Sequence, residues 1–378
     1  MHGTRIFDGV IVIGAGAAGL AVTHALLRAG VPVRLLEQER HIGEPWRRRH
    51  KNLELNTHRT LSALPGVSYP VGTPAFPGKS LVIDMLDRFR QQHKLPIEFG
   101  VRIDRIARTG GHWTLSSNMG TRTASHVVVA TGRDRTPHIP DWKGMAAFGG
   151  RVVHAADFGD GADYAGKKIL VVGAGNSGFD VLNHLSRVDT ADIWLSARHG
   201  PTLLPKRIFN ISVHLMSPYI ARLPVRLADA LLRAGQRIAF GDLTRYGLPP
   251  APAGGASRLA DDYVAIASDD GAVDAIKSGR IKVVPEIGQF SGDGVILANG
   301  ERVRPDIVIA ATGYRTGLEQ MVGALGVLDA KGYPLFNGAD HSSGLPGLWF
   351  TGMRPSIRGC FANARLQARA IAAAIKVG

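Results

Sequence analysis

Cysteine is nearly missing from this chain of 378 residues, which contains only Cys360. A single cysteine excludes an intramolecular disulfide framework and is typical of the reducing cytoplasm, where we expect this protein. Long apolar runs are missing too, and none approaches the roughly 18 residues that a membrane-spanning helix requires. The first residues lead directly into an apolar strand. We therefore expect neither a signal peptide nor an integral membrane segment.

Acidic residues are outnumbered by basic ones, 31 against 45, which gives a formal net charge of +14. Such a charge favours polyanionic partners by electrostatics alone. The basic residues are nevertheless scattered, and the dense run at residues 47–51 lies outside any nucleic-acid-binding module. We expect no nucleic acid partner and attribute this run to the phosphates of a small ligand. A hydrophobic content of 45% with 20% charged residues is typical of an ordered globular protein, here of two domains.

Glycine is abundant and forms one recurrent pattern. Residues 10–38 read VIVIGAGAAGLAVTHALLRAGVPVRLLEQ: a strand, Gly14-x-Gly16-x-x-Gly19, a helix, and a strand ending at Glu37. The first glycine makes a tight turn, the second lets the backbone approach a pyrophosphate, and the third allows close packing of helix on strand. The helix N-terminus faces the phosphates, and the carboxylate accepts hydrogen bonds from an adenosine ribose. The pattern predicts a dinucleotide site.

The pattern returns at residues 168–198, KILVVGAGNSGFDVLNHLSRVDTADIWLSAR, with Gly173-x-Gly175-x-x-Gly178. Here Arg198 stands near the place of the carboxylate. An arginine at this place suits the 2′-phosphate of NADPH, and the alternative is a solvated surface arginine. Because each motif has its full strand–turn–helix–strand context, we predict two different dinucleotides, one of them NADPH.

The segments that follow the two motifs resemble one another. Residues 97–132 and 281–314 each predict a short strand, a three-stranded meander and an apolar strand ending in Ala-Thr-Gly. This duplication predicts an α/β fold of two Rossmann-like dinucleotide-binding domains, each with a three-stranded β-meander. We place the first domain at residues 1–143 and 314–378, and the second at residues 144–313.

Residues 205–246 are rich in leucine and arginine and predict a helical insert in the second domain. The stretch LPPAPAGGAS that follows predicts a flexible loop. Three roles are open for the insert: helices packed on the second domain, a cap over a substrate pocket, or a basic amphipathic helix on a membrane surface. The first of these is the expectation.

Residues 148–158, FGGRVVHAADF, fit the pattern FxGxxxHxxxF just before the second glycine motif. With the two motifs, Gly43-x-x-Trp46 and both Ala-Thr-Gly strands, the chain resembles the flavin-containing monooxygenases, a subclass of the class B flavoprotein monooxygenases. Within this family the chain is similar to the YUCCA branch in four short segments, GAGNSG, LLPKR, IKSGRIKVV and GLWFTGM. The related Baeyer–Villiger enzymes have tryptophan where this chain has Phe158. One departure is Glu44, which stands where the family often has a second glycine.

The resemblance implies an enzyme that oxygenates a small organic substrate with NADPH, O2 and FAD through a flavin hydroperoxide. The reaction is either a YUCCA-like oxidative decarboxylation of indole-3-pyruvate or the N- or S-oxygenation of amines and sulfides. A non-oxygenating NADPH:flavin reductase or oxidase is the alternative from another class. Disulfide reductases need a cysteine pair, which this chain lacks. The cofactor carries the chemistry, so we expect no metal ligands, and a homodimer is left open.

The resemblance also assigns site residues. FAD contacts are expected from Gly14, Gly16, Ala18, Gly19, Glu37, Trp46, Val101, Thr131 and Gly132. NADPH contacts are expected from Gly173, Gly175, Asn176, Ser177, Gly178, Ser196, Arg198, Thr312 and Gly313. Trp46 packs either on the flavin or in the core. Asn56 is the catalytic candidate, facing flavin and nicotinamide, or else an ordinary turn asparagine. His154 is expected to organise the interdomain linker rather than act as a base.

Overall fold

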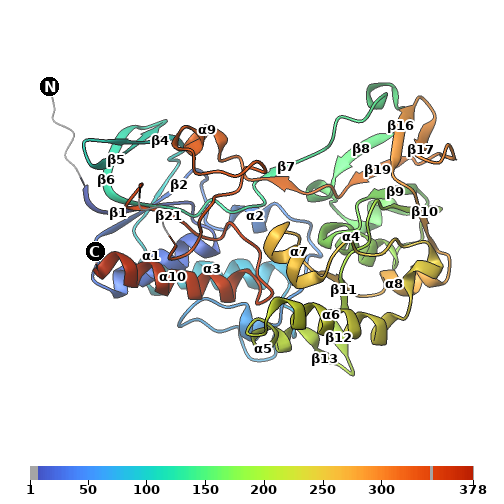
Figure 1. Cartoon of the computed structure of the whole chain (residues 1–378), viewed down its shortest axis with the longest axis horizontal. Helices are drawn as coiled ribbons and strands as arrows, with labels where there is room; N and C mark the ends of the chain where they lie inside the picture. The colour runs from blue at the N-terminus through green and yellow to red at the C-terminus, as the bar shows by residue number, and fades with distance from the viewer. Residues whose placement is uncertain (1–6, 341–343, 378) are drawn as a thin grey trace. The chain divides into compact units, whose positions relative to one another are not determined.

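The computed structural model describes residues 7–340 and 344–377, and the chain divides into two units (Figure 1). The first unit comprises Met1–Arg48, Thr57–Thr136 and Tyr314–Gly378, and the second comprises Arg49–Asn56 and Pro137–Gly313. The boundaries thus differ from the predicted ones in two segments.

Each difference has a physical reason within the second unit. The chain crosses at residues 136/137 rather than 143/144 because the extended segment that follows packs on the second unit, where Trp142 meets Phe290 with 5.6 Å between ring centroids. Residues 49–56 join the same unit because His50 and Asn56 contact its first long helix.

The first unit is an α/β layer structure built on one mixed sheet of strand order β3-β2-β1-β6-β5-β4, with β21 also paired to β6. Its elements are β1 Phe7–Ile13, α1 Ala17–Arg28, β2 Val33–Glu37, α2 Glu44–Arg47, α3 Lys79–Gln92, β3 Ile97–Phe99, β4 Ile103–Thr109, β5 His112–Ser117, β6 Gly120–Val129, β7 Thr136–Pro137, β20 Tyr314–Arg315, α9 Glu319–Val322, β21 Leu348–Phe350 and α10 Cys360–Val377.

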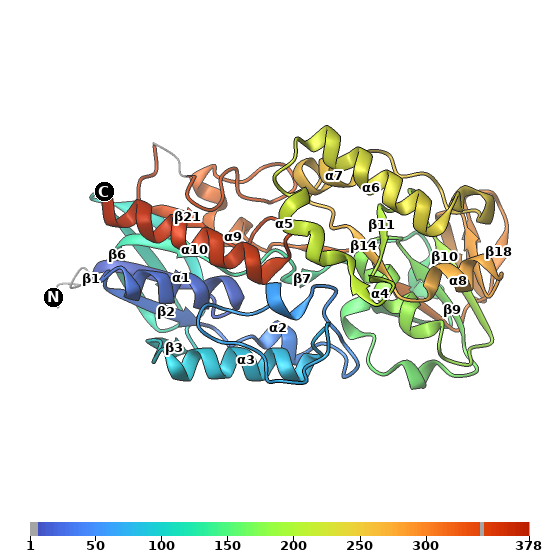
Figure 2. The ribbon, with the colours of Figure 1, turned by 90° about the horizontal axis from the view of Figure 1, so that it is seen from below.

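Strand β1 is the centre of this sheet because it is apolar on both faces. Val12 pairs in parallel register with Leu35 on one side and Val128 on the other, and all three side chains are buried. Helices α1 and α10 lie side by side, as Figure 2 shows, and α10 buries an alanine-rich face. The carboxyl ends of β1, β2 and β6 therefore share one edge, beside the start of α1.

The second unit repeats this plan with a parallel sheet of order β15-β10-β9-β19-β8 and a separate antiparallel sheet β16-β17-β18. Its elements are β8 Arg151–His154, β9 Lys168–Val172, α4 Asn176–Leu185, β10 Asp192–Ser196, β11 Leu203–Pro205, β12 Arg207–Ile208, β13 Ile211–Ser212, α5 Ser217–Ile220, α6 Val225–Phe240, α7 Gly255–Asp261, β14 Ala267–Asp269, α8 Ala272–Lys277, β15 Ile281–Val284, β16 Ile287–Ser291, β17 Gly294–Leu297, β18 Arg302–Val303 and β19 Ile307–Ala310.

The predicted α/β class and both meanders are confirmed, with one difference between the repeats. In the first unit the last meander strand and the closing parallel strand are one continuous strand, β6. In the second unit β18 ends and a new strand, β19, enters the parallel sheet. The meander is thus part of the main sheet in one unit and a separate sheet in the other.

The insert was predicted to be helical from its start, and this prediction is wrong for its first residues. Residues 207–212 form the two-stranded hairpin β12–β13, and α5 and α6 follow it. Helix α7 begins at Gly255, inside the stretch predicted as a loop. Within residues 7–340 and 344–377, no helix combines the length and apolar character needed to cross a bilayer.

Candidate functional site

The three glycines of the first motif have different reasons to be glycine. Gly14 has φ +101°, and a Cβ there would come within 2.8 Å of the Ala130 carbonyl oxygen. A Cβ on Gly19 would collide with the carbonyl oxygen of Gly14. Gly16 has φ −81° and ψ −174°, which any residue adopts, and its Cβ would meet nothing within 4 Å. Packing and backbone conformation therefore explain Gly14 and Gly19 but not Gly16.

The second motif repeats this arrangement in its own unit. Gly173 has φ +107° and lies against the Ala311 carbonyl, and a Cβ on Gly178 would collide with Gly173. Gly175 has φ −79° and ψ −170°, with open space where its Cβ would be. Each unit thus holds one turn that is open at its second glycine, at the N-terminus of a long helix. Such a turn can receive a pyrophosphate.

Glu37 ends β2 with its side chain turned to the first glycine turn. Its Oε2 accepts a hydrogen bond from Ala15 N at 2.6 Å, and its Oε1 accepts one from Glu39 N at 3.0 Å. Burial raises the pKa of this carboxyl, although the backbone hydrogen bonds oppose the rise. A carboxylate offers about four lone-pair positions, so both oxygens keep acceptor capacity for a ribose.

The residues after β6 complete the edge beside Gly14. The hydroxyl of Thr131 is buried and has no hydrogen-bond partner among the described residues, and Gly132 follows with φ +79°. The backbone of Val101 donates to the carbonyl of Glu37 at 2.9 Å. An unpartnered buried hydroxyl beside an open glycine turn fits the phosphates of FAD, because buried polar groups are normally hydrogen-bonded.

Trp46 lies on α2 and is half-buried. Its ring stacks on Phe361 with 5.7 Å between centroids and 26° between planes. Both predicted roles remain compatible with this contact, since one face of the indole is used by packing within the first unit.

Ser196 and Arg198, two residues at or just after the end of β10 that were predicted to contact NADPH, differ in exposure. The side chain of Arg198 is 73% exposed, and its Nε pairs with Glu286 Oε2 at 3.1 Å. Ser196 is buried at the end of β10 and donates its hydroxyl to the Pro285 carbonyl at 2.9 Å. The guanidinium of Arg198 is therefore accessible to a phosphate, whereas the hydroxyl of Ser196 is used in joining β10 to the residue after β15.

Asn56 is held at the second glycine turn. Its Nδ2 donates to Oδ1 of Asn176 at 3.2 Å, and Asn176 is the first residue of α4, followed by Ser177. The same segment is anchored two residues earlier, where Lys206 Nζ pairs with Glu54 Oε2 at 3.1 Å. The structure thus brings Asn56 into contact with Asn176, a residue that the sequence predicts to bind NADPH.

His154 fixes the end of the second Ala-Thr-Gly strand. Its Nδ1 accepts from Ala156 N at 3.0 Å, which leaves Nε2–H to donate to the Gly313 carbonyl at 2.9 Å. Thr312 donates its hydroxyl to the His138 carbonyl. Burial lowers the pKa of His154, so the neutral ring is favoured. Both ring nitrogens are engaged where the chain leaves the second unit, an arrangement that suits a structural role better than that of a base.

Two residues of the basic run at 47–51, which was attributed to ligand phosphates, form ion pairs with carboxylates of the protein instead. Arg47 Nη2 pairs with Asp87 Oδ2 at 2.7 Å, and Lys51 pairs with Asp160. These carboxylates neutralise the two cations, so ligand phosphates are not needed to account for them.

One polar cluster was missed by the sequence analysis, which expected no metal ligands. His50, Asp180 and His184 have ligand atoms within 4.8 Å of one another, a grouping that could hold a metal ion. His50 Nε2 lies 3.4 Å from Asp180 Oδ2, and the His50 ring also packs edge-on against Phe158. Asp180 and His184 are one turn apart on α4, a spacing visible in the sequence, but His50 comes from a segment 130 residues earlier in the chain.

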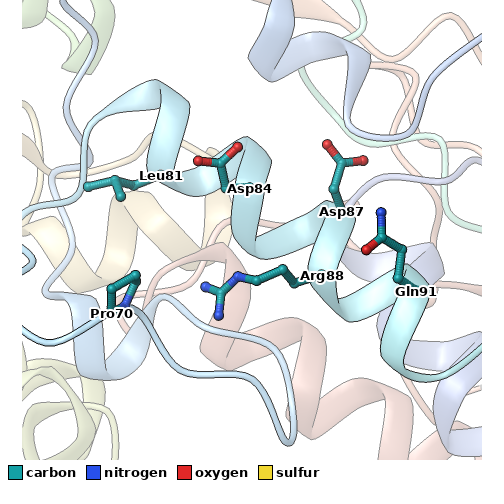
Figure 3. A pocket seen from close by; sticks show the side chains of 6 residues that line it. All are labelled: Pro70, Leu81, Asp84, Asp87, Arg88 and Gln91. Carbon is teal, nitrogen blue, oxygen red and sulfur yellow. The ribbon is translucent and has the colours of Figure 1, made fainter.

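A surface hollow of about 320 Å³ lies along the outer side of α3 in the first unit (Figure 3). It is lined by Pro70, Leu81, Asp84, Asp87, Arg88 and Gln91. The hollow contains none of the predicted site residues.

Comparisons with known proteins identify the family of this chain. Residues 11–219 match the family described as pyridine nucleotide-disulphide oxidoreductase. The probable indole-3-pyruvate monooxygenase YUCCA8 of Arabidopsis thaliana is 30% identical over 364 residues, covering 91% of this chain and 84% of that protein. The probable indole-3-pyruvate monooxygenase YUCCA3 of the same plant is 34% identical over 82% of this chain and 74% of its own length.

A solved structure shares the fold across nearly the whole chain. The flavin-containing monooxygenase from Stenotrophomonas maltophilia superposes with a TM-score of 0.73 at 22% identity, covering 97% of this chain and 99% of that one. A family match over more than half of the chain and relatives of 30% identity or more show that the chain belongs to the flavin-containing monooxygenases, and that it is an FAD-dependent oxidoreductase using FAD and NADPH.

Proposed function

We propose that this protein is an NADPH- and O2-dependent monooxygenase that oxygenates a small organic molecule. The observation that carries the proposal is the pair Gly16 and Gly175, which are glycines without a reason in backbone conformation or packing. Each occupies the phosphate position of a dinucleotide turn, one in each unit. Two dinucleotides in one chain with a single cysteine suit an enzyme that passes reducing equivalents to oxygen rather than to a disulfide.

The two turns are assigned to different dinucleotides by the residues at the following strand ends. Glu37 offers carboxylate oxygens to the two ribose hydroxyls of FAD, while its backbone hydrogen bonds hold it at the turn. Arg198 offers a positive, exposed guanidinium to the 2′-phosphate of NADPH, for which a carboxylate would be repulsive. When bound, FAD supplies acceptance of the NADPH hydride and the activation of O2.

Asn56 is the side chain to which we assign the orientation of the nicotinamide. An amide can donate and accept hydrogen bonds without delivering a proton. Its hydrogen bond to Asn176 Oδ1 occupies one of its Nδ2 protons and leaves the other and Oδ1 for NADPH. A group that orients without acid chemistry suits a reaction in which stray protonation leads to hydrogen peroxide instead of product.

We propose a 2-oxo acid as the substrate class, with indole-3-pyruvate as the first compound to test. The support is that relatives of 30% to 34% identity are named indole-3-pyruvate monooxygenases. The balanced reaction joins the 2-oxo acid, NADPH, a proton and O2. It yields the acid one carbon shorter, CO2, NADP⁺ and water. The single cysteine supports a location in the reducing cytoplasm for this reaction.

The test is a product assay with isotopically labelled dioxygen, NADPH and the FAD-loaded protein. Indole-3-pyruvate, a thioether and a tertiary amine are incubated separately, and products are identified by mass spectrometry. Catalase is present throughout, because free hydrogen peroxide decarboxylates 2-oxo acids without an enzyme.

We expect one labelled oxygen atom in indole-3-acetate and near-equal consumption of NADPH and substrate. Labelled sulfoxide or amine oxide with no indole-3-acetate would instead identify heteroatom oxygenation. NADPH oxidation with no labelled product from any compound would identify a reductase or oxidase and overturn the proposal.

A further inference from the structure

The turn of the hairpin β12–β13 contains Phe209, and neither the backbone conformation nor packing favours a phenylalanine there. Phe209 and Asn210 form the two-residue turn and have φ +47° and +62°. Asparagine and glycine tolerate such angles, whereas a bulky side chain is strained there. Phe209 is also 95% exposed, so its ring gains nothing from packing. A strained and exposed aromatic residue at a turn points to a contact with something outside the chain.

Helix α6 carries further exposed apolar side chains. Leu227, Leu231 and Ile238 are spaced four and seven residues apart, so they share one helix face, and they are 47%, 48% and 85% exposed. An adjoining face, about 100° around the helix, is buried through Ala228 and Leu232. A surface helix needs only one apolar face to pack on its own domain. The second face of α6 is therefore available to a partner.

Exposed apolar residues also lie in the segment that connects the hairpin to α6. Met216 is 54% exposed and Tyr219 is 63% exposed, on either side of the start of α5. Figure 1 shows the hairpin and α6 along one edge of the second unit. We call the set made by Ile208, Phe209, Ile211, Leu227, Leu231 and Ile238 the exposed apolar face.

The charge along α6 is of one sign on its accessible surface. Arg226, Arg233 and Arg237 fall on a common side of the helix, next to the exposed apolar stripe, and all three are exposed. The one acidic residue of the helix, Asp229, is buried and accepts hydrogen bonds from Ala256 N, Ser257 N and Ser257 Oγ. An apolar stripe bordered by arginines is typical of a helix that lies in a membrane interface.

We propose that residues 207–240 dock on the surface of an anionic phospholipid bilayer. The 16-residue helix α6 would lie flat over about 24 Å, with the exposed apolar face in the acyl boundary and the arginines at the lipid phosphates. Charge decides against a second copy of the chain as the occupant. Two copies meeting through this face would bring their arginine rows together, in a protein that carries a net charge of +14.

The test is co-sedimentation of the FAD-loaded full chain with vesicles of pure phosphatidylcholine and of phosphatidylcholine with one-third phosphatidylglycerol. Three variants are compared with the unmodified protein. The apolar variant is Phe209→Ser with Ile238→Ser, and the charge variant replaces Arg226, Arg233 and Arg237 by Gln. The matched control is Val71→Ser, because Val71 is fully exposed in the first unit. NADPH oxidation without vesicles reports that each variant is folded.

We expect binding to the anionic vesicles that weakens in high salt. The apolar variant should lose roughly 10- to 100-fold in partitioning. The charge variant should lose roughly 100-fold, at about fivefold for each arginine. Val71→Ser should bind like the unmodified protein. Absence of vesicle binding, or equal binding by all four proteins, overturns the proposal. Self-association in sedimentation equilibrium that the apolar variant abolishes, without vesicle binding, would identify a second copy as the occupant and overturn it too.

Discussion

The carboxylate of Glu37 accepts a hydrogen bond from the backbone nitrogen of Ala15 at 2.6 Å, which joins the end of β2 to the first glycine turn. Ala15 immediately precedes Gly16, the glycine with no structural reason of its own. This one hydrogen bond therefore fixes the position of Glu37, proposed to hold a ribose, relative to Gly16, proposed to admit a pyrophosphate. Binding of FAD should depend on both Glu37 and Gly16. Folding should depend less on these two residues than on Gly19.

Gly16→Ala should yield a folded protein that lacks FAD. The backbone at Gly16 permits alanine and the new methyl group meets no protein atom within 4 Å, so the methyl group occupies the ligand's space alone. Gly19→Ala should instead destabilise the fold, because its Cβ collides with the Gly14 carbonyl. The flavin absorbance per polypeptide and the thermal unfolding midpoint separate the two outcomes. Full flavin occupancy in folded Gly16→Ala would contradict the assignment.

Gly175→Ala is the matched control in the other unit. It has the same backbone conformation and the same open space as Gly16. This variant should stay yellow and fail to be reduced by NADPH, while dithionite still reduces it. If it loses flavin as Gly16→Ala does, the two turns are not assigned to different dinucleotides.

Arg198→Ala should raise the KM for NADPH roughly 10- to 100-fold and leave the KM for NADH nearly unchanged. A charge-assisted hydrogen bond to the 2′-phosphate is worth roughly 1.5–3 kcal/mol, and NADH has no such phosphate. Steady-state NADPH and NADH oxidation measures both values. Arg187→Ala is the control, since Arg187 is also exposed and ion-paired in this unit but lies at the end of α4 away from the turn. Equal losses with both cofactors would show that Arg198 acts structurally through Glu286.

Asn56→Ala should increase the hydrogen peroxide released for each NADPH consumed. Losing one amide hydrogen bond costs roughly 0.5–1.5 kcal/mol, enough to shift the partition between product and peroxide severalfold. Peroxide is measured with a peroxidase-coupled dye alongside NADPH absorbance. Asn52→Ala is the control, because Asn52 is an exposed asparagine of the same segment that donates to Asp160. Equal uncoupling by the two variants would remove Asn56 from the catalytic site.

The sequence predicts the two units well because periodicity and glycine spacing are local properties. Gly14, Gly19 and their counterparts Gly173 and Gly178 are where the motif puts them, with the steric reasons that it implies. The contact between Asn56 and Asn176 could not be predicted in the same way, since it joins residues 120 positions apart. The contact between His50 and Asp180 could not be predicted for the same reason, because these residues are 130 positions apart.

Composition misled the prediction in one segment. The leucine- and arginine-rich stretch after Pro205 favours a helix, yet residues 207–212 turn back as a hairpin through Phe209 and Asn210. No residue there is the glycine that usually marks such a turn. The missing turn residue is the same observation that marks Phe209 as unusual.

His24 should make the first unit sensitive to acid. Burial, then the nearby His93 and Arg28, lower the pKa of His24 from 6.5 to about 4. The ring packs between α1 and α3, with its centroid 4.1 Å from that of His93 and 5.3 Å from that of Phe89. As pH falls below 6.5 the unfolded chain binds this proton first, because its pKa is the higher one. The stability contributed by neutral His24 is therefore full above pH 6.5 and is lost progressively down to about pH 4.

The size of this loss follows from the shift, at about 1.4 kcal/mol for each pKa unit, which sets an upper value of about 3 kcal/mol. Urea unfolding of the protein and of His24→Gln at pH 7 and pH 4.5 measures it. The variant should be somewhat less stable at pH 7 and should lose less of its stability between the two pH values. Other histidines, His126 and His154 among them, also have lowered pKa values, so the difference between the two proteins is the quantity that reports His24. An equal loss in both proteins would mean that His24 does not titrate in this range.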